Sequence, residues 1–252
     1  MTQSDFLKSI RQHFWNLNFT EVEIPYLNTS LPLEPNLYSF KSTWAHHNKN
    51  YFLPTSPEFA LKKFLSNHRQ NCFSISHCFR DLENKSPNHT PEFLMLEWYE
   101  IDKDYQDLML SLKKFIHHFI DIEFTTLTLP QKLPTNEPDF NQFFLNKIES
   151  KLPKNKAVFI TGYPPFLSPL AKANERFELY INGIEIANGC TENTDSQSIT
   201  TAFNQEKEYR LKNKLPLHPI STSFASNSAK IEKVAGLGLG LDRLLKIINT
   251  NK

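Results

Sequence analysis

Two glutamates beside an Asn-Gly pair have a spacing that could support chemistry. The stretch ERFELYINGIEIANG (residues 175–189) contains the dipeptide typical of a two-residue β-hairpin turn. Counting outward from this turn pairs Tyr180 with Glu185 and Glu178 with Ala187, so both glutamates project from one face, about 7–8 Å apart. Such carboxylates repel each other unless a cation lies between them, and Mg²⁺ carried by a triphosphate would be suitable. Geometry alone also allows a solvated face with two ordinary glutamates.

A second predicted hairpin, FRDLENKSPNHTPEFLMLEWYE (residues 79–100), combines charged and large apolar residues. Arg80 ends one strand, and Glu97 and Tyr99 lie on its partner. Arginine suits bidentate capture of a carboxylate or phosphate. Phe93 could stack on a base. The alternative is that the aromatic residues belong to the core and that Arg80 pairs with a nearby acid.

The third stretch, GLGLGLDRLLK, places glycines at alternate positions before an arginine. Gly236, Gly238 and Gly240 fall on one face of a predicted strand, and a bare face lets a bulky group approach the backbone. Arg243 follows at the start of a helix. The spacing is not the G-x-G-x-x-G of a dinucleotide-binding loop. Close packing of a helix on the strand is the alternative.

The surrounding elements indicate how these residues are positioned. Strands joined by hairpins, without repeated βαβ units, predict an α+β fold in which helices lie on one side of an antiparallel sheet. The Pro- and Asn-rich segment 125–157 is the best candidate for an insert or connection within one domain, residues 1–252. Apolar spacing predicts helices over 4–17, 57–65, 104–120, 199–213 and after the glycine strand. Alternation predicts strands within 19–25, 51–53, 72–80, 92–101 and 175–189, and a strand and turn over 157–166.

Composition narrows the class of protein. The chain has 252 residues and a formal net charge of +1, so no overall basic field indicates nucleic-acid binding. Three cysteines without C-x-x-C spacing argue against a zinc site and favour a reducing compartment. No apolar run approaches the roughly 20 residues that span a bilayer. We therefore expect a soluble, cytoplasmic protein without a membrane partner.

Taken together, the stretches resemble the class II aminoacyl-tRNA synthetases, and specifically their lysyl branch. EVEIP resembles motif 1, FRDLENKSPNHTPEFLMLEWY motif 2 and GLGLGLDRL motif 3. TSPEFALKKFL, SPLAK and ERFELYINGIEIANGCTE are similar to lysyl-specific segments between the motifs. The resemblance covers nearly the whole chain. It implies the class II catalytic fold, and a homodimer with Pro25 at its interface.

The resemblance also implies site residues, with ATP and Mg²⁺ as cofactors. Arg80 would hold the α-phosphate and the substrate carboxylate, while Phe93 and Arg243 would lie on opposite faces of adenine. Arg80 and Arg243 would thus be the catalytic residues, and Glu178 and Glu185 the Mg²⁺ ligands. Further ATP contacts would come from Leu82, Glu83, His89, Thr90, Ile186 and Gly240, and the amino acid would contact Ser56, Glu58, Glu97, Tyr99, Asn188, Glu192 and Gly238.

The sequence departs from the family pattern at several positions. The spacing from Arg80 to the motif 2 histidine is one residue longer than expected, so Leu82 stands where a glutamate usually reads adenine. Either Glu83 or backbone groups would replace that glutamate. Thr90 replaces the usual asparagine, and Cys190 replaces a common phenylalanine. No phosphate-binding charge is lost, so we expect an active enzyme.

The implied reaction is activation of lysine as an aminoacyl-adenylate. The first helix and motif 1 begin within the first ~25 residues, which leaves no room for an anticodon-binding OB-fold. Stand-alone lysyl domains resemble the paralogs that transfer β-lysine to a lysine of elongation factor P, our expected acceptor. Those paralogs usually carry alanine at the position of Gly238. Glycine leaves more room there, so we expect this chain to accept α-lysine as well as β-lysine. A minimal ligase for tRNA or a small acceptor, and a non-catalytic regulatory paralog, are the alternatives.

Overall fold

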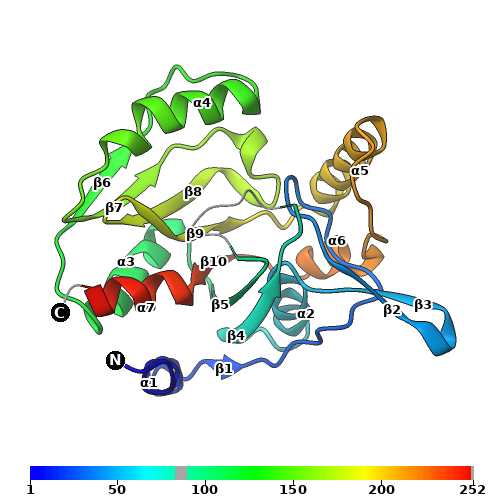
Figure 1. Ribbon diagram of the computed structural model, residues 1–252, viewed down its shortest axis with the longest axis horizontal. Coiled ribbons are helices and arrows are strands. Elements are labelled where there is room, and N and C mark those ends of the chain that lie inside the picture. Colours follow the sequence, from blue (N-terminus) through cyan, green and yellow to red (C-terminus); the bar gives the residue numbers. More distant parts are fainter. Residues whose placement is uncertain (83–89, 251–252) are drawn as a thin grey trace.

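An eight-stranded sheet forms the centre of the computed structural model, which describes residues 1–82 and 90–250 (Figure 1). Among the described strands, the two edge pairs are parallel and the other neighbours are antiparallel. The predicted α+β class is therefore confirmed. In spatial order the strands are β1 Thr20–Glu21, β4 Cys72–Phe79, β5 Glu92–Ile101, β10 Val234–Gly240, β9 Ile184–Glu192, β8 Ala171–Ile181, β7 Ala157–Thr161 and β6 Phe124–Thr128.

Three helices cover one face of this sheet: α1 Gln3–Asn16, α3 Tyr105–His117 and α7 Leu241–Thr250. In α1, Phe6, Ile10 and Phe14 recur at helical spacing and are buried against the strands. The side chain of Asp104 caps α3 and completes a capping box with Asp107. Capping and apolar spacing thus explain why these segments are helical, as predicted.

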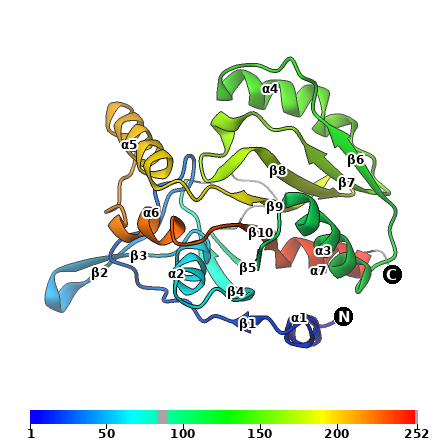
Figure 2. The ribbon, with the colours of Figure 1, turned by 180° about the vertical axis from the view of Figure 1, so that it is seen from behind.

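Within residues 1–82 and 90–250, the helices on the opposite face lie at its two ends (Figure 2). Helix α4 Glu137–Lys147 packs over β7 and β8, while α2 Glu58–His68, α5 Ser196–Lys212 and α6 Thr222–Ser228 lie toward the other end. The expectation of helices on one side was therefore wrong. Strand β5 shows the reason, because Trp98 joins the core under α1 while its neighbour Tyr99 packs toward α2. The middle of this second face is left for a site.

Several smaller elements differ from the prediction. Pro57 is the N-cap of α2 rather than its first residue, and the helix continues to His68. The segment 125–157 supplies β6, α4 and the 3₁₀ turn η2 Glu149–Lys151. A separate two-stranded hairpin projects from the body (Figure 1), and it consists of β2 Lys41–Trp44, the 3₁₀ turn η1 Ala45–His47 and β3 Lys49–Phe52. A third 3₁₀ turn, η3 Pro165–Leu167, precedes β8.

Among the helices of residues 1–82 and 90–250, none combines the length and the apolar character that a bilayer-spanning helix requires.

Candidate active site

The β8–β9 hairpin carries both predicted glutamates, but its register corrects the prediction. Tyr180 pairs with Glu185 as expected, whereas Glu178 pairs with Asn188 and not with Ala187. A register shift between Leu179 and Tyr180 indicates a β-bulge, in which two residues oppose one. The bulge turns Ala187 into the core and brings Asn188 onto the same face as both glutamates.

Strand β10 supplies a floor without side chains beside this hairpin. Its glycines share one face, as predicted, and Gly238 lies between Asn188 of β9 and Glu97 of β5. Gly236 makes room for a neighbouring ring, because a Cβ atom there would lie 2.2 Å from Cε1 of Tyr99. The open face between the two flanking strands is therefore a direct result of the alternating glycines.

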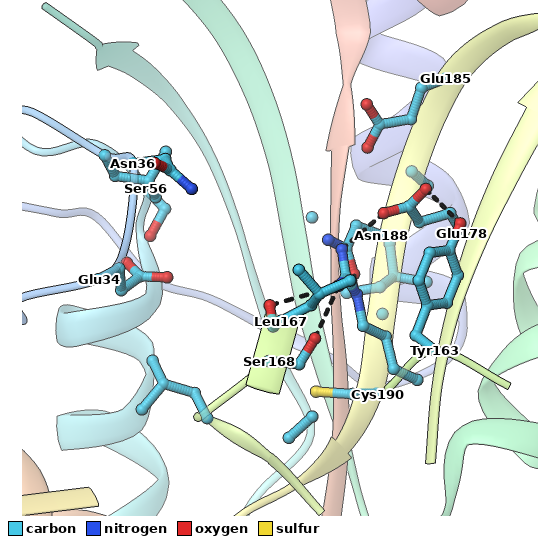
Figure 3. A pocket seen from close by; sticks show the side chains of 18 of the residues that line it. Glu34, Asn36, Ser56, Tyr163, Leu167, Ser168, Glu178, Glu185, Asn188 and Cys190 are labelled. Atoms are coloured by element: carbon cyan, nitrogen blue, oxygen red, sulfur yellow. Dashed lines mark hydrogen bonds and ion pairs between the residues drawn. The ribbon is translucent and has the colours of Figure 1, made fainter. Parts of the chain in front are cut away.

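A cavity of about 790 Å³ opens over this floor. Figure 3 shows Glu34 and Ser56 on one side of it, facing Asn188 and Glu178 on the other. Among the described residues, Leu82 and Thr90 do not line it, and Leu82 is 58% exposed. Glu83 and His89 lie outside the described residues. The cavity brings together the remaining predicted site residues: Ser56, Glu58, Arg80, Phe93, Glu97, Tyr99, Glu178, Glu185, Ile186, Asn188, Glu192, Gly238, Gly240 and Arg243.

Glu178 is buried at one end of the cavity and is held by three donors. Arg176 donates to its Oε1 at 2.5 Å, while the hydroxyls of Tyr163 and Tyr180 donate to its Oε2 at 2.5 and 3.0 Å. Burial and the nearby carboxylate raise the pKa values of both tyrosines, so both remain protonated donors. These bonds offset the cost of burying the carboxylate and fix its orientation.

Glu185 lies near Glu178 and Arg243. Nη1 of Arg243 donates to the backbone oxygen of Glu185 at 2.9 Å and lies 3.7 Å from its Oε2. Although the side chain is partly exposed, burial in the cavity and then the nearby Glu178 carboxylate raise the pKa of the Glu185 carboxyl to about 7. Such a carboxyl would readily bind a cation in place of its proton.

The two glutamates fit a magnesium ion that arrives with a nucleotide. Across residues 1–82 and 90–250, no group of three His, Cys, Asp or Glu side chains could hold a metal by itself. Mg²⁺ often takes one or two carboxylates and completes its shell with phosphate oxygens and water. Two carboxylates beside a cavity are therefore sufficient for metal bound with phosphate.

Arg80 lies at the end of β4, where it meets the cavity. Its Nε donates to the carbonyl of Thr55 at 3.2 Å, and its guanidinium lies 5.1 Å from the centroid of the Phe93 ring. Arginine commonly stacks on aromatic rings in this way. The arrangement presents a cation and a flat apolar surface side by side, which suits a phosphate next to a base.

The other end of the cavity holds acids around a buried lysine. Lys62 is 1% exposed, and its Nζ lies 2.6 Å from Oε1 of Glu58 and 2.6 Å from Oε2 of Glu192. Burial disfavours its charge, but the two carboxylates outweigh this effect and raise the pKa of Lys62. The hydroxyl of Tyr99 donates to Glu97 at 2.7 Å.

Carboxyl groups outnumber ammonium groups at this end. Glu34, Glu58, Glu97 and Glu192 line the cavity, and among the described residues the cations that oppose them are Lys62 and Arg80. Burial and the neighbouring acids raise the pKa of Glu34 to about 8 and that of Glu192 to about 7, and the pKa of Glu97 also lies well above its ordinary value. The pocket thus suits a ligand that brings positive charge.

Sequence reasoning did not identify Glu34, Lys62 or Arg176 as site residues. A signal for Lys62 was present, because Glu58, Leu61, Lys62 and Leu65 follow i, i+3, i+4, i+7 spacing and form the buried face of α2. A lysine on an otherwise buried helical face needs an acidic partner. Glu34 and Arg176 lie on a loop and a strand without comparable local patterns.

Comparison with known proteins identifies the family of this chain. The family model of class II tRNA synthetases (D, K and N) matches residues 1–252. The chain is 30% identical to an "Elongation factor P--(R)-beta-lysine ligase homolog" of Aquifex aeolicus (strain VF5), over 96% of this chain and 92% of that protein. It is 28% identical to an elongation factor P--(R)-beta-lysine ligase of Histophilus somni (strain 2336) and 29% identical to one of Avibacterium paragallinarum, each over 98% of this chain and 90% of the relative.

Proposed function

We propose that this chain, which belongs to the class II tRNA synthetases (D, K and N), uses ATP to activate lysine or β-lysine and transfers it to a lysine side chain of elongation factor P. The names of its relatives support this acceptor. We further propose that residues 1–252 act as a single catalytic domain.

The excess of carboxyl groups around Lys62 carries the proposal for the amino acid. Lysine and β-lysine each have two ammonium groups and one carboxylate. When a cationic ligand displaces their protons, Glu34, Glu58, Glu97 and Glu192 carry more negative charge than Lys62 and Arg80 neutralise. Buried charges require charged partners, so a substrate with two ammonium groups fits the pocket better than an amino acid with an uncharged side chain would.

In the proposed reaction, positioning supplies most of the catalysis. A carboxylate oxygen of lysine attacks the α-phosphorus of ATP, pyrophosphate leaves, and an aminoacyl-adenylate forms. Arg80 would hold the two reacting groups together, and Arg243 would face the outer phosphates. Glu178 and Glu185 would hold Mg²⁺, which when bound neutralises charge on the phosphate oxygens.

The second step forms an amide bond. The ε-amine of the acceptor lysine attacks the carbonyl carbon of the adenylate, AMP leaves, and the amine loses a proton. We assign no general base, because AMP is a good leaving group and the acceptor needs only to be bound in its neutral amine form. The chain's own contribution is to orient the adenylate between Arg80 and the acidic end of the cavity.

The surroundings of Gly238 bear on which isomer is used. A Cβ atom at this position would lie 3.4 Å from Sδ of Met95 and 3.7 Å from Oε2 of Glu97, which are ordinary contacts. Packing therefore does not require glycine here, and its absent side chain leaves extra room beside Glu97. This space supports use of α-lysine as well as β-lysine.

We also propose a homodimer formed around Pro25. Trp15, Leu17, Tyr26 and Leu27, which lie near Pro25 in the sequence, expose 43% to 56% of their surface. Several exposed large apolar side chains in one segment support an interface there.

Labelling of the acceptor tests the function. Purified protein, Mg-ATP and labelled α- or β-lysine would be incubated with elongation factor P or with total tRNA, and acid-precipitable label counted after protease or RNase. Protease-sensitive label on the factor would support the proposal, and the preferred isomer would show the role of Gly238. RNase-sensitive label would instead indicate a minimal tRNA ligase. Label on neither, without pyrophosphate exchange, would favour a non-catalytic paralog.

A further inference from the structure

Lys62 contacts two acids that line the cavity. It is buried on α2 and does not itself line the cavity, but its ammonium contacts Glu58 on its own helix and Glu192 on β9. It therefore ties the helix to the sheet through charge. The ring of Phe224, whose centroid lies 5.0 Å from Nζ, adds an aromatic contact.

Each glutamate gives only one of its oxygens to Lys62. Glu58 uses Oε1, and Glu192 uses Oε2. The second oxygen of Glu192 accepts only a weak bond from the Cys190 thiol, at 3.5 Å. Within the described part of the chain, no bond joins the second oxygen of Glu58 to another side chain. Both carboxylates line the cavity, so each keeps an acceptor for a ligand.

We propose that Lys62 determines specificity as a positioning residue: it bridges Glu58 and Glu192 so that their second oxygens each receive one of the two ammonium groups of a diamino acid. This inference rests on the proposed function, since it assigns the substrate's two amines to two named carboxylates. Glu58 would take the amine near the reacting carboxylate, and Glu192 the amine of the side chain.

The bridge explains why a neutral analogue should be rejected. Norleucine has the length of lysine's aliphatic chain but no terminal ammonium, so it would leave the second oxygen of Glu192 buried with only the weak bond from the Cys190 thiol. A site built to bond a polar group discriminates strongly against an analogue that lacks it. Without Lys62, Glu58 and Glu192 would repel each other, and they would separate or bind protons. Either change would remove the preference for a dication.

If Lys62 had a purely structural role, its replacement would have different effects on stability and on substrate preference. If the residue only anchors α2, its replacement lowers stability and total activity but leaves the ratio of lysine to norleucine use unchanged. The substrate ratio and the separate KM values for lysine and ATP therefore distinguish the two roles.

The test compares Lys62→Met with Lys63→Met. Lys63 is the exposed neighbour on the same helix, so the control makes the same substitution outside the pocket. Amino-acid-dependent pyrophosphate exchange would be measured with lysine and with norleucine. For Lys62→Met we expect the KM for lysine to rise, and the lysine-to-norleucine ratio to fall, by roughly tenfold or more, with the KM for ATP little changed. Lys63→Met should match the original protein.

A second variant covers failure to fold. Lys62→Met/Glu192→Gln removes a positive and a negative charge together, so it should fold even if Lys62→Met does not. Its reference is Glu192→Gln alone, and its KM for lysine should exceed that of the reference because Glu58 has also lost its positioning contact. A lysine KM and substrate ratio unchanged from the original protein in Lys62→Met, or a lysine KM unchanged from Glu192→Gln in the double variant, would overturn the inference. So would failure of both variants to fold, which would assign Lys62 to folding alone. Absence of lysine-dependent exchange in the original protein would instead contradict the proposed function.

Discussion

Arg80 is the single residue on which adenylate formation should depend most. Replacing it with alanine removes the cation expected to hold both reacting groups, and loss of such an arginine typically costs about 10³-fold or more in rate. Arg80 follows the end of β4 and is only partly buried at the edge of the cavity, outside the hydrophobic core, so Arg80→Ala should stay folded. Pyrophosphate exchange and a thermal melt check both halves of this prediction. Normal exchange in the folded variant would show that the site assignment is wrong.

Glu192 should affect lysine far more than ATP. Glu192→Gln keeps the shape of the side chain but removes the charge that faces Lys62 and the proposed substrate amine. We expect the KM for lysine to rise about 10- to 100-fold, since losing a charged hydrogen bond costs about 1.5–3 kcal/mol. Glu208→Gln, on an exposed position of α5, is the matched control. Equal losses for lysine and ATP would argue against Glu192 as a reader of the side chain.

Some site residues could be predicted from the sequence, and others could not. Charged residues inside recognisable motifs, such as Arg80 and Glu185, were identified from the sequence and line the cavity. Lys62 was missed because a lysine in a helix is usually exposed, and only its spacing with Leu61 and Leu65 marked it as buried. The partner Glu192 is 130 positions away in the chain, so their contact depends on tertiary structure.

Strand β10 offers a test at the scale of one element, through two glycines on the same face. A Cβ atom at Gly236 would lie 2.2 Å from the Tyr99 ring, whereas at Gly238 its closest contact would be 3.4 Å. Gly236→Ala should therefore destabilise the protein by about 1–3 kcal/mol through overpacking. Gly238→Ala should change the free energy of unfolding by less than about 0.5 kcal/mol. Denaturant titration of both variants checks the contrast, and equal effects would contradict it.

The bulge in the β8–β9 hairpin and helix α4 were not predicted from the sequence. The Asn-Gly turn correctly gave the pairing of Tyr180 with Glu185, but the bulge beyond it has no local sequence mark, so Glu178 was assigned the wrong partner. The proline and asparagine content of segment 125–157 favoured an insert or connection over a helix. Yet Asn136 caps α4, a proline follows within its first turn, and both features are start signals for a helix.

The pH dependence of lysine binding is a property of the whole site. Glu34 and Glu192, with pKa values of about 8 and 7, are partly protonated near neutral pH. The groups facing them are Glu58, Glu97, Arg80, Lys62 and Cys190. A bound dication would expel these protons, so lysine affinity should rise between pH 6 and 8, by at most about tenfold per unit for each proton released. Calorimetry in buffers of different ionisation enthalpy measures the release, and none would contradict the prediction.

The same carboxyls should shape the stability of the free protein. Because their folded-state pKa values are raised, their stabilising contribution is complete below the ordinary value of 4.5 and is lost as pH rises through about 7 and 8. Saturating lysine should reduce this loss by supplying counter-charge. Urea titrations across this range, with and without lysine, check the effect. Glu192→Gln serves as the variant in which part of the loss should already be absent.

The central place of β10 has a consequence for synthesis of the protein. This strand lies between β5 and β9 although it follows every other described strand of the sheet in the chain, so a growing chain exposes two unpaired strand edges until residues 234–240 are available. The floor of the cavity is missing over the same period. Activity should therefore arise abruptly once residues 234–240 have been made, and ribosome-bound intermediates that stall before β10 should be the species that chaperones protect.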